Sequence, residues 1–443
     1  MSRRRTFAVE VDRRKASLLR PATLNADAPA PSFAELTRAS AQVGLLGFGG
    51  PAGQIALMHR IFVEEKRWID EERYLHALNY CTLLPGPEAQ QLATYVGWLL
   101  HGVRGGVVAG ALFVLPGAVV VFALSWLYAS LGHVPVVAAL FYGVKAAVVA
   151  LVAEALWRIG KRALKGWADV AVAVAAFLSL AVFSVPFPVV VLAAALIGFL
   201  RGPGETEPVV GHGPAPSARK AFTAAAVWAA LWLAPLGLAA LLLGPQHILT
   251  RVGELFSVLA MVSFGGAYAV MAFLQQQAVQ VQHWLTLGQM IDGLGLAETT
   301  PGPLTLTNQF VGFMAGWNAG GGLLLATATA AMASWQTFAP SYLFIFAGAP
   351  YAEDLRRNPK ARSALAGVTA AVLGVIANLA VWFTAHVFFG EVHGLAPVWT
   401  SFDPFAAVLA LAAGVALLRY RVNVALVVAG CALTGLLRLA LAS

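Results

Sequence analysis

Two short stretches combine helix-breaking residues with a row of polar side chains, and they are built alike. The first runs from Leu84 to Gln91 (LPGPEAQQ) and the second from Thr300 to Gln309 (TPGPLTLTNQ). Proline lacks a backbone donor and glycine tolerates unusual dihedral angles, so each Pro-Gly-Pro interrupts a helix. A helix that starts directly afterwards presents free N–H groups and the positive end of its dipole. We therefore expect two helix starts that attract an anion.

Polar groups beside both breaks are the first candidates for binding a substrate. Amide, hydroxyl and backbone N–H groups donate hydrogen bonds without carrying a charge, which suits an oxyanion. The candidates here are Gly86, Glu88, Gln90, Gln91, Gly302, Thr305, Asn308 and Gln309. The alternative role for each polar side chain is a hydrogen bond between membrane helices.

Two glycine clusters precede the Pro-Gly-Pro breaks. Phe48-Gly49-Gly50 is matched by Phe264-Gly265-Gly266, at an offset of 216 residues. Glycine can unwind a span and expose backbone groups to a cavity, whereas the simpler interpretation is close helix packing. The recurrence beside the second break favours the first interpretation. The clusters add these candidates for substrate binding: Gly49, Gly50, Gln54, Gly265 and Gly266.

Ionisable side chains are rare within the expected apolar segments, and the candidates are Glu88, Lys145, Glu154 and Glu298. A charge inside a bilayer costs on the order of 3 kcal/mol or more, so such residues are functional candidates. Lys145 is interpreted as a fixed positive charge for an anion, or as a partner for Glu88. Glu88 and Glu298 flank the breaks and are the proton-coupling candidates. A structural cap or a buried pair is the alternative for each of them.

The composition is that of a membrane protein. Of the 443 residues, 59% are hydrophobic and only 11% are charged, whereas soluble domains carry about 25%. Apolar runs of about 20 residues predict an all-α polytopic membrane protein. The net charge of +8 is not gathered on a basic face with aromatics, so nucleic acid is not an expected partner. The chain has no HExxH, GxSxG, Walker loop or His/Cys cluster, so no enzyme activity, metal or cofactor is expected.

The apolar runs predict about 13 spans. They lie at 33–59, 74–100, 105–129, 135–158, 167–184, 186–201, 221–243, 252–276, 288–315, 320–346, 363–389, 404–419 and 421–441. We expect a basic disordered cytoplasmic tail (1–32), an N-terminal repeat (33–201), a linker with a linking helix (202–250) and a C-terminal repeat (251–443). With a cytoplasmic N-terminus, most basic loops fall inside. The basic loop at 60–73 falls outside in this count, or else it is an interfacial helix beside a re-entrant segment.

The two halves repeat one another. The Pro-Gly-Pro stretches share the offset of 216, and after one deletion Gly97 matches Gly312 and Gly105 matches Gly320. An odd number of expected spans separates the starts of the two repeats. The second repeat is therefore expected to be inverted in the membrane, with the linking helix supplying the odd crossing.

This ordered set of motifs resembles the chromate ion transporter family in its long, two-domain form. The motifs are FGGPAGQIALMH at 48–59, LPGPEAQQ at 84–91, FGGAY at 264–268, TPGP at 300–303 and GAPY at 348–351. The resemblance implies a secondary transporter that exports chromate across the cytoplasmic (inner) membrane and gives chromate resistance. It also implies sulfate as a competing analogue and proton-coupled exchange.

We expect as partners chromate or a sulfate-like oxyanion, the lipid bilayer and, as an assembly, a homodimer. In the expected mechanism, the two Pro-Gly-Pro starts and the two glycine clusters converge near the midplane, and Lys145 supplies charge. One half then rocks against the other. Three alternatives remain, namely a transporter of sulfate or a small carboxylate, a passive channel, and a membrane-embedded enzyme. The enzyme would need a nucleophile, metal or redox cofactor that the sequence does not offer.

Overall fold

The computed structural model describes residues 31–48, 50–132, 134–183, 185–201, 218–264, 267–349, 359–393 and 396–442. Nearly all of the expected tail and the linker at 202–217 lie outside these residues. Among the described residues the only sheet is a short antiparallel pair, β1 (Val392–His393) with β2 (Ala396–Pro397). Almost everything else is helical, which confirms the all-α expectation.

Helices follow one another along both halves of the chain. The first half forms α2 (Phe33–Leu46), α3 (Gly50–His59), the π-helix η1 (Arg60–Glu65), α4 (Glu71–Cys81), α5 (Glu88–Leu131), α6 (Pro135–Ala163), α7 (Trp167–Ala181) and α8 (Phe187–Arg201). Between the halves lies α9 (Ala218–Leu243). The second half forms α10 (Ile248–Val262), α11 (Ala267–Gln275), the π-helix η2 (Gln276–Val281), α12 (Leu287–Thr299), η3 (Leu304–Leu306), α13 (Thr307–Gly316), η4 (Trp317–Gly321), α14 (Gly322–Gly348), α16 (Pro359–Phe388), η6 (Trp399–Ser401), α17 (Pro404–Leu418) and α18 (Val424–Ala442).

Local sequence signals start several of these helices. Ser32 and Glu35 form a capping box at α2, in which the Glu35 N–H donates to the Ser32 hydroxyl (3.2 Å) and the Ser32 N–H donates to the Glu35 carboxylate (2.7 Å). Thr286 and Gln289 repeat this device at α12. Such caps satisfy backbone donors that a helix start leaves free. They fix the start of α2, which leads to the first glycine cluster, and the start of α12, which leads to the second Pro-Gly-Pro break.

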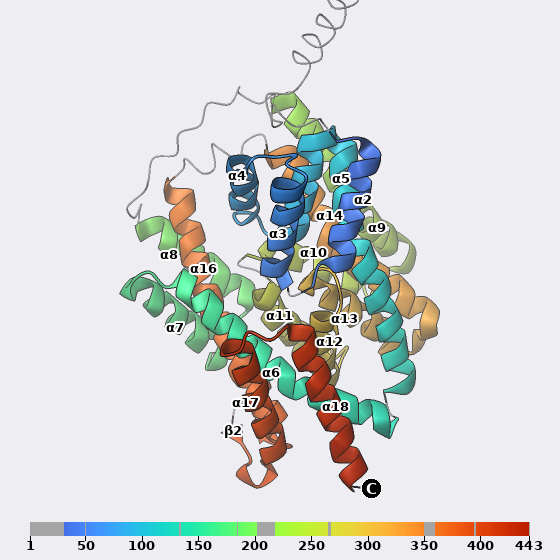
Figure 1. Cartoon of the computed structure of the whole chain (residues 1–443), viewed down its shortest axis with the longest axis vertical. Coiled ribbons are helices and arrows are strands. Elements are labelled where there is room, and N and C mark those ends of the chain that lie inside the picture. The colour runs from blue at the N-terminus through green and yellow to red at the C-terminus, as the bar shows by residue number, and fades with distance from the viewer. Residues whose placement is uncertain are drawn as a thin grey trace, which may run out of the picture.

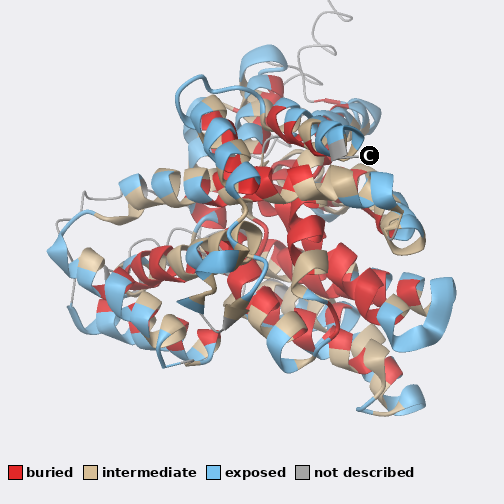
Figure 2. Cartoon of the chain, turned by 90° about the horizontal axis from the view of Figure 1, so that it is seen from below, coloured by how far each residue is buried: buried red, intermediate tan, exposed pale blue. Residues whose placement is uncertain are grey.

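Five of the described helices are long and apolar enough to cross a membrane. They cover Glu88–Leu131, Pro135–Lys161, Ala221–Leu243, Ser363–Phe388 and Val424–Leu441. Shorter apolar helices of 15 residues are α7, α8 and α17. Figure 2 shows buried residues gathered towards the centre and exposed ones on the outer helices, where many large apolar side chains lie. Lipid tails suit such a surface, and the fold is that of a polytopic membrane protein.

Four segments that were expected as single spans are interrupted near their middle. The segment 33–59 divides into α2 and α3, 74–100 into α4 and the start of α5, 252–276 into α10 and α11, and 288–315 into α12 and α13. Most of these pieces are too short to cross a bilayer alone, since about 20 residues are needed. In Figure 1, α2, α3 and α4 lie together at one end of the molecule, and α11, α12 and α13 lie nearer its middle.

The long helix α5 folds back on itself. His101 and Gly102 leave the helical dihedral angles, and Gly102 has a φ of +62°. The part after this turn packs along the part before it, because a Cβ atom on Gly97 would clash with the carbonyl oxygen of Gly105. In the second half, a Cβ atom on Gly312 of α13 would lie 2.7 Å from a carbonyl oxygen of α14. Glycine at both positions lets two helix backbones touch.

Each half also packs a pair of short helices on the other half. Helices α17 and α18 pack on α6, whereas α7 and α8 pack on α16. A Cβ atom on Gly143 of α6 would clash with the carbonyl oxygen of Cys431 in α18, and one on Gly367 of α16 would clash with that of Ala194 in α8. The two halves are therefore interlocked through two matching close contacts between backbones.

Candidate functional site

The interrupted segments of the two halves are hydrogen-bonded to each other. The N–H of Gly86 donates to the carbonyl oxygen of Ser263 at 2.9 Å, and the N–H of Gly302 donates to that of Gly47 at 3.0 Å. Both pairs follow the offset of 216 residues, so each Pro-Gly-Pro break contacts the residue just before the glycine cluster of the opposite half. Gly86 and Gly302 have φ angles of +112° and +96°, a region that glycine adopts without strain. The sequence thus brings four distant breaks to one place.

Gln54 strengthens this junction. Its side chain is fully buried, and its Nε2 atom donates to the carbonyl oxygens of Gly47 (3.1 Å) and Gly302 (2.5 Å). One amide therefore joins both halves at the point where their backbones are unwound. Its Oε1 atom has no hydrogen-bond partner among the described residues. A buried polar atom of this kind has unused capacity for a ligand or a water.

A small cavity lies at this junction. It is lined by Pro51, Gln54, Gly86, Pro87, Glu88, Ala89, Pro303, Leu304 and Thr305. Its volume of about 20 Å³ holds about one water. The structure therefore brings four of the expected residues to one cavity, namely Gln54, Gly86, Glu88 and Thr305, and Gln54 binds a fifth, Gly302. A tetrahedral oxyanion needs this space to widen.

The donors at the cavity are those of a helix start. Pro87 is the N-cap of α5 and Glu88 is its first residue. Because the N–H groups of Gly86 and Gly302 already have acceptors, the backbone donors that remain here belong to the first turns of α5 and η3. Glu88 brings a carboxyl group to the same place. The arrangement can bind an anion and carries a group able to accept a proton beside it.

Other expected residues lie close to the cavity without lining it. Gln91 folds back so that its Nε2 atom donates to the carbonyl oxygen of Pro85 at 2.7 Å. Gln90 is buried, and its Oε1 atom has no partner in the part of the chain that is described. Gly50 begins α3 with a φ of +69°, and none of the described residues has an atom within 4 Å of the position of an added Cβ. Gly49, Gly265 and Gly266 lie outside the described residues.

Asn308 and Gln309 are turned towards neighbouring helices. The Asn308 amide donates to the Thr337 hydroxyl of α14 at 3.0 Å, and the Gln309 amide donates to the carbonyl oxygen of Ala118 in α5 at 2.8 Å. Both are buried. Their contacts match the helix-packing alternative that the sequence left open.

Lys145 pairs with a carboxylate that was not among the candidates. Its Nζ atom lies 3.5 Å from Oδ2 of Asp292, and the Tyr128 hydroxyl donates to the same oxygen at 2.8 Å. Asp292 is 4% exposed. It stands in the expected apolar segment 288–315, so the rule that selected Glu298 also points to Asp292. A buried carboxylate here gives Lys145 a counter-charge on α12.

Glu298 is also held by a hydroxyl group. It is buried, and its carboxylate accepts a hydrogen bond from Tyr268 at the start of α11. Glu154 forms an ion pair with Arg158 one turn further along α6 (3.6 Å). Neither carboxylate lines the small cavity. Glu298 therefore contacts the segment that follows the second glycine cluster, not the cavity itself.

Comparison with known proteins identifies the family of the chain. Residues 34–199 and 250–436 match the chromate transporter family. The chain belongs to the chromate transporter family. The two matched stretches correspond to the two interlocked halves, and the unmatched stretch between them contains α9.

Relatives within the family are similar over most of their length. The chromate transport protein of Pseudomonas aeruginosa is 34% identical over 360 residues, which cover 80% of this chain and 82% of that protein. The chromate transport protein of Cupriavidus metallidurans is 30% identical over 414 residues, covering 92% and 94%. An uncharacterized transporter of Methanocaldococcus jannaschii is 23% identical, covering 80% and 85%. No solved structure matches this chain.

Proposed function

We propose that this member of the chromate transporter family is a secondary transporter that exports chromate across the cytoplasmic membrane. The observation that carries the proposal is the junction of the four breaks around Gln54. Interrupted membrane helices that meet at one point are the common design of ion sites in secondary transporters. The names of the relatives identify chromate as the substrate to test first.

The two halves are proposed to be inverted repeats joined by α9. The paired hydrogen bonds of Gly86 and Gly302 support this, because each is the counterpart of the other at the offset of 216 residues. The reciprocal packing of the short helix pairs on α6 and α16 supports it as well. Rocking of one such half against the other would open the central cavity to each side in turn.

The anion is proposed to bind at the junction once the cavity widens. The first turn of α5 and the Thr305 hydroxyl, which has no partner among the described residues, would then donate hydrogen bonds to its oxygens. The Gln54 amide would join them once its bonds to Gly47 and Gly302 break. Glu88 lines the same cavity, so its negative charge would oppose the anion and its protonation would remove that opposition. A proton bound at Glu88 together with the anion would travel in the same direction, so exchange of protons for chromate requires Glu88 to release its proton to the cytoplasm before the anion enters. Glu298 is the second proton-coupling candidate, acting through α11.

The N-terminus is proposed to be cytoplasmic. The ring of His101 is hydrogen-bonded to the carbonyl oxygen of Pro31 at 2.9 Å, so the turn of α5 lies beside the start of α2. If α2 and α3 enter and leave from this end, the basic loop at 60–73 also lies there. The basic loop that fell outside in the span count would then lie inside, as the positive-inside rule expects. A membrane potential of 100 mV, negative inside, would favour outward movement of a dianion by about 4.6 kcal/mol.

Substitution of one central glycine tests the site. Gly302→Leu places a side chain at a φ of +96° inside the junction and should reduce chromate export at least tenfold. Gly322→Leu is the matched control, because Gly322 also has a positive φ (+61°) but no atom within 4 Å of an added Cβ. Export is measured as the fall in accumulation of radiolabelled chromate by cells that express each variant. Equal export by both variants would contradict a central site.

A further inference from the structure

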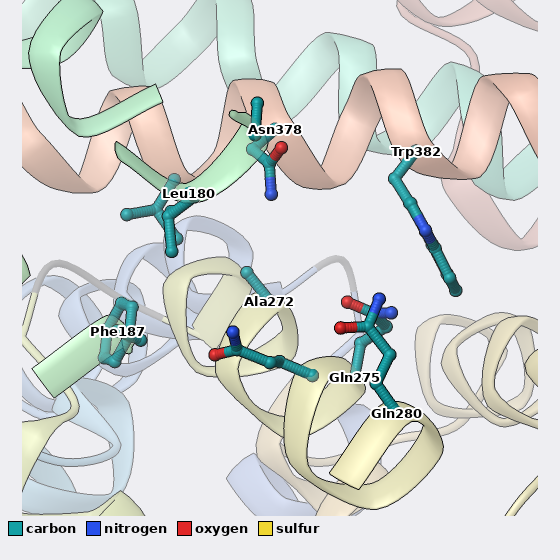
Figure 3. A pocket seen from close by; sticks show the side chains of 10 residues that line it. Leu180, Phe187, Ala272, Gln275, Gln280, Asn378 and Trp382 are labelled. Carbon is teal, nitrogen blue, oxygen red and sulfur yellow. The ribbon is translucent and has the colours of Figure 1, made fainter. Parts of the chain in front are cut away.

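A larger polar cavity lies apart from the junction of the four breaks. It has a volume of about 260 Å³, which is several times the roughly 30 Å³ that a water occupies in the liquid. It lies between the connection of α7 to α8, the end of α11 with η2, and α16. The remaining lining residues are mostly apolar, but four carry an amide side chain. These four are Gln275, Gln276, Gln280 and Asn378. Figure 3 shows the labelled amides of Gln275, Gln280 and Asn378 directed into a common space.

The amides of this cavity have unused hydrogen-bonding capacity. Gln275 is only 7% exposed, and its Nε2 donor has no partner among the described residues. The Oε1 atom of Gln276 is likewise buried and unpartnered within the described chain. Buried polar atoms are normally paired, so each such atom calls for a ligand or a water. Among the described residues no acidic or basic side chain lines the cavity, which leaves neutral donors and acceptors as its chemistry.

The backbone at this cavity has an unusual form. Gln276 to Val281 form the π-helix η2 directly after α11, and π-helical turns are frequent at functional sites. The first half has its own π-helix at the same offset, η1. There the three matching positions hold ionisable residues: His59, Arg60 and Glu64 replace Gln275, Gln276 and Gln280.

These ionisable counterparts already have partners. His59 lies 3.1 Å from Glu64 and 2.6 Å from Glu71, and Arg60 lies 3.4 Å from Glu65. An anion that binds there must displace an ion pair. In the amide-lined cavity the anion meets uncharged donors, and among the described lining residues it has no carboxylate to displace. The π-helix thus presents ionisable side chains in the first half and amide side chains in the second.

The cavity is connected to the central junction by a single short helix. Helix α11 begins just after the second glycine cluster and ends at Gln275, a rise of about 13 Å. Phe187, which lines the cavity, stacks on buried Phe273 of α11 at a centroid distance of 5.3 Å. Helix α11 therefore ends at the cavity and contacts Phe187, one of its lining residues.

We propose that this cavity, the amide vestibule formed by Gln275, Gln276, Gln280 and Asn378, is a second binding station for the transported oxyanion. The inference rests on the proposed function, since it takes the oxyanion as the substrate. Neutral amides bind a partly hydrated tetrahedral anion weakly enough to release it. With a cytoplasmic N-terminus, the vestibule lies at the outer end and receives the anion that leaves the central cavity.

Equilibrium binding of radiolabelled chromate to the full-length protein in lipid nanodiscs tests the proposal. Wild type should bind two chromate ions, and Gln275→Met should bind one. Gln277→Met is the matched control, because Gln277 lies in the same π-helix but does not line the vestibule. It should bind two. In transport, Gln275→Met should raise the KM of uptake from the outer side about tenfold, the cost of one hydrogen bond to a charged group.

The possible results separate this inference from the proposed function. A single chromate site that Gln275→Met leaves intact and Gly302→Leu removes would overturn the vestibule and keep the proposed function. Equal loss of binding in Gln275→Met and Gln277→Met, with intact thermal stability, would also overturn it. Absence of saturable chromate binding by folded wild type would overturn the proposed function, and the vestibule with it.

Discussion

At the scale of single residues, the contact of Lys145 with Asp292 changes what Lys145 is expected to do. A lysine alone in a membrane segment is available to an anion, whereas one that faces a buried carboxylate is partly neutralised. The Asp292 side chain is buried, so removing Lys145 would leave a buried carboxylate without compensation and destabilise the fold. An effect of Lys145 substitution on transport must therefore be separated from an effect on stability.

We predict that Lys145→Ala abolishes chromate transport and lowers the thermal stability of the protein. The double variant Lys145→Met with Asp292→Asn should regain most of the stability, since no unpaired charge remains, but it should not regain transport. Thermal unfolding and chromate uptake are measured on the same preparations. Lys161→Ala, on the same helix, is the control and should transport normally. Recovery of transport by the double variant would show that the pair is structural.

The sequence predicted part of the candidate site. Gln54, Gly86, Glu88 and Thr305 were selected by residue type and do line one cavity. The direction in which Asn308 points could not be predicted, because the 3-10 turn at Leu304–Leu306 shifts the helix phase. Partners from the other half cannot be read from local spacing at all. The sequence shows which side chains are unusual, and the fold decides which of them meet.

At the scale of elements, long apolar helices are the most predictable part of the fold. The expected spans at 135–158 and 221–243 correspond closely to α6 and α9. The four interrupted segments are harder, since a piece of 9 to 15 residues can either continue a crossing or turn back. Hydropathy does not distinguish these courses, because both bury the same apolar side chains. The glycine and proline signals located the breaks but not the direction after them.

The packing of α18 on α6 predicts different effects on stability for two glycine substitutions in α18. A Cβ atom on Gly435 would clash with the carbonyl oxygen of Ala139, whereas no atom lies within 4 Å of one on Gly430. Gly435→Ala should therefore lower the thermal unfolding temperature by several degrees. Gly430→Ala should leave it unchanged or raise it slightly, because alanine favours helix by about 1 kcal/mol. Thermal unfolding in detergent compares the two, and equal stability would mean that α18 does not pack in this way.

At the scale of the whole molecule, the proposed orientation predicts which loops face the cytoplasm. Both native cysteines, Cys81 and Cys431, are buried and are replaced by alanine. Single cysteines are then introduced at Trp167 (88% exposed) and Trp399 (77% exposed). A membrane-impermeant maleimide on intact cells should label the cysteine at 399, and the one at 167 only after permeabilisation. The reverse labelling pattern would mean that the orientation in the membrane is the opposite of the proposed one. The amide vestibule would then face the cytoplasm, where chromate enters the exporter.

The interlocking of the halves links this orientation to transport. Neither half can move without carrying helices that are packed on the other, so the central junction is the place where relative movement is concentrated. Because the cavity at the junction is small and hydrogen bonds join the two halves there, the centre of the protein is closed in this structure. In the proposed mechanism, these bonds break as the anion enters and reform as it leaves.

Chromate uptake into everted membrane vesicles tests the central claim most directly, because uptake there corresponds to export from the cell. Vesicles containing the protein are energised, and radiolabelled chromate uptake is followed with and without excess sulfate. We predict saturable, energy-dependent uptake that sulfate inhibits and that Gly302→Leu abolishes. No uptake, in vesicles where the protein is shown to be inserted, would contradict chromate export.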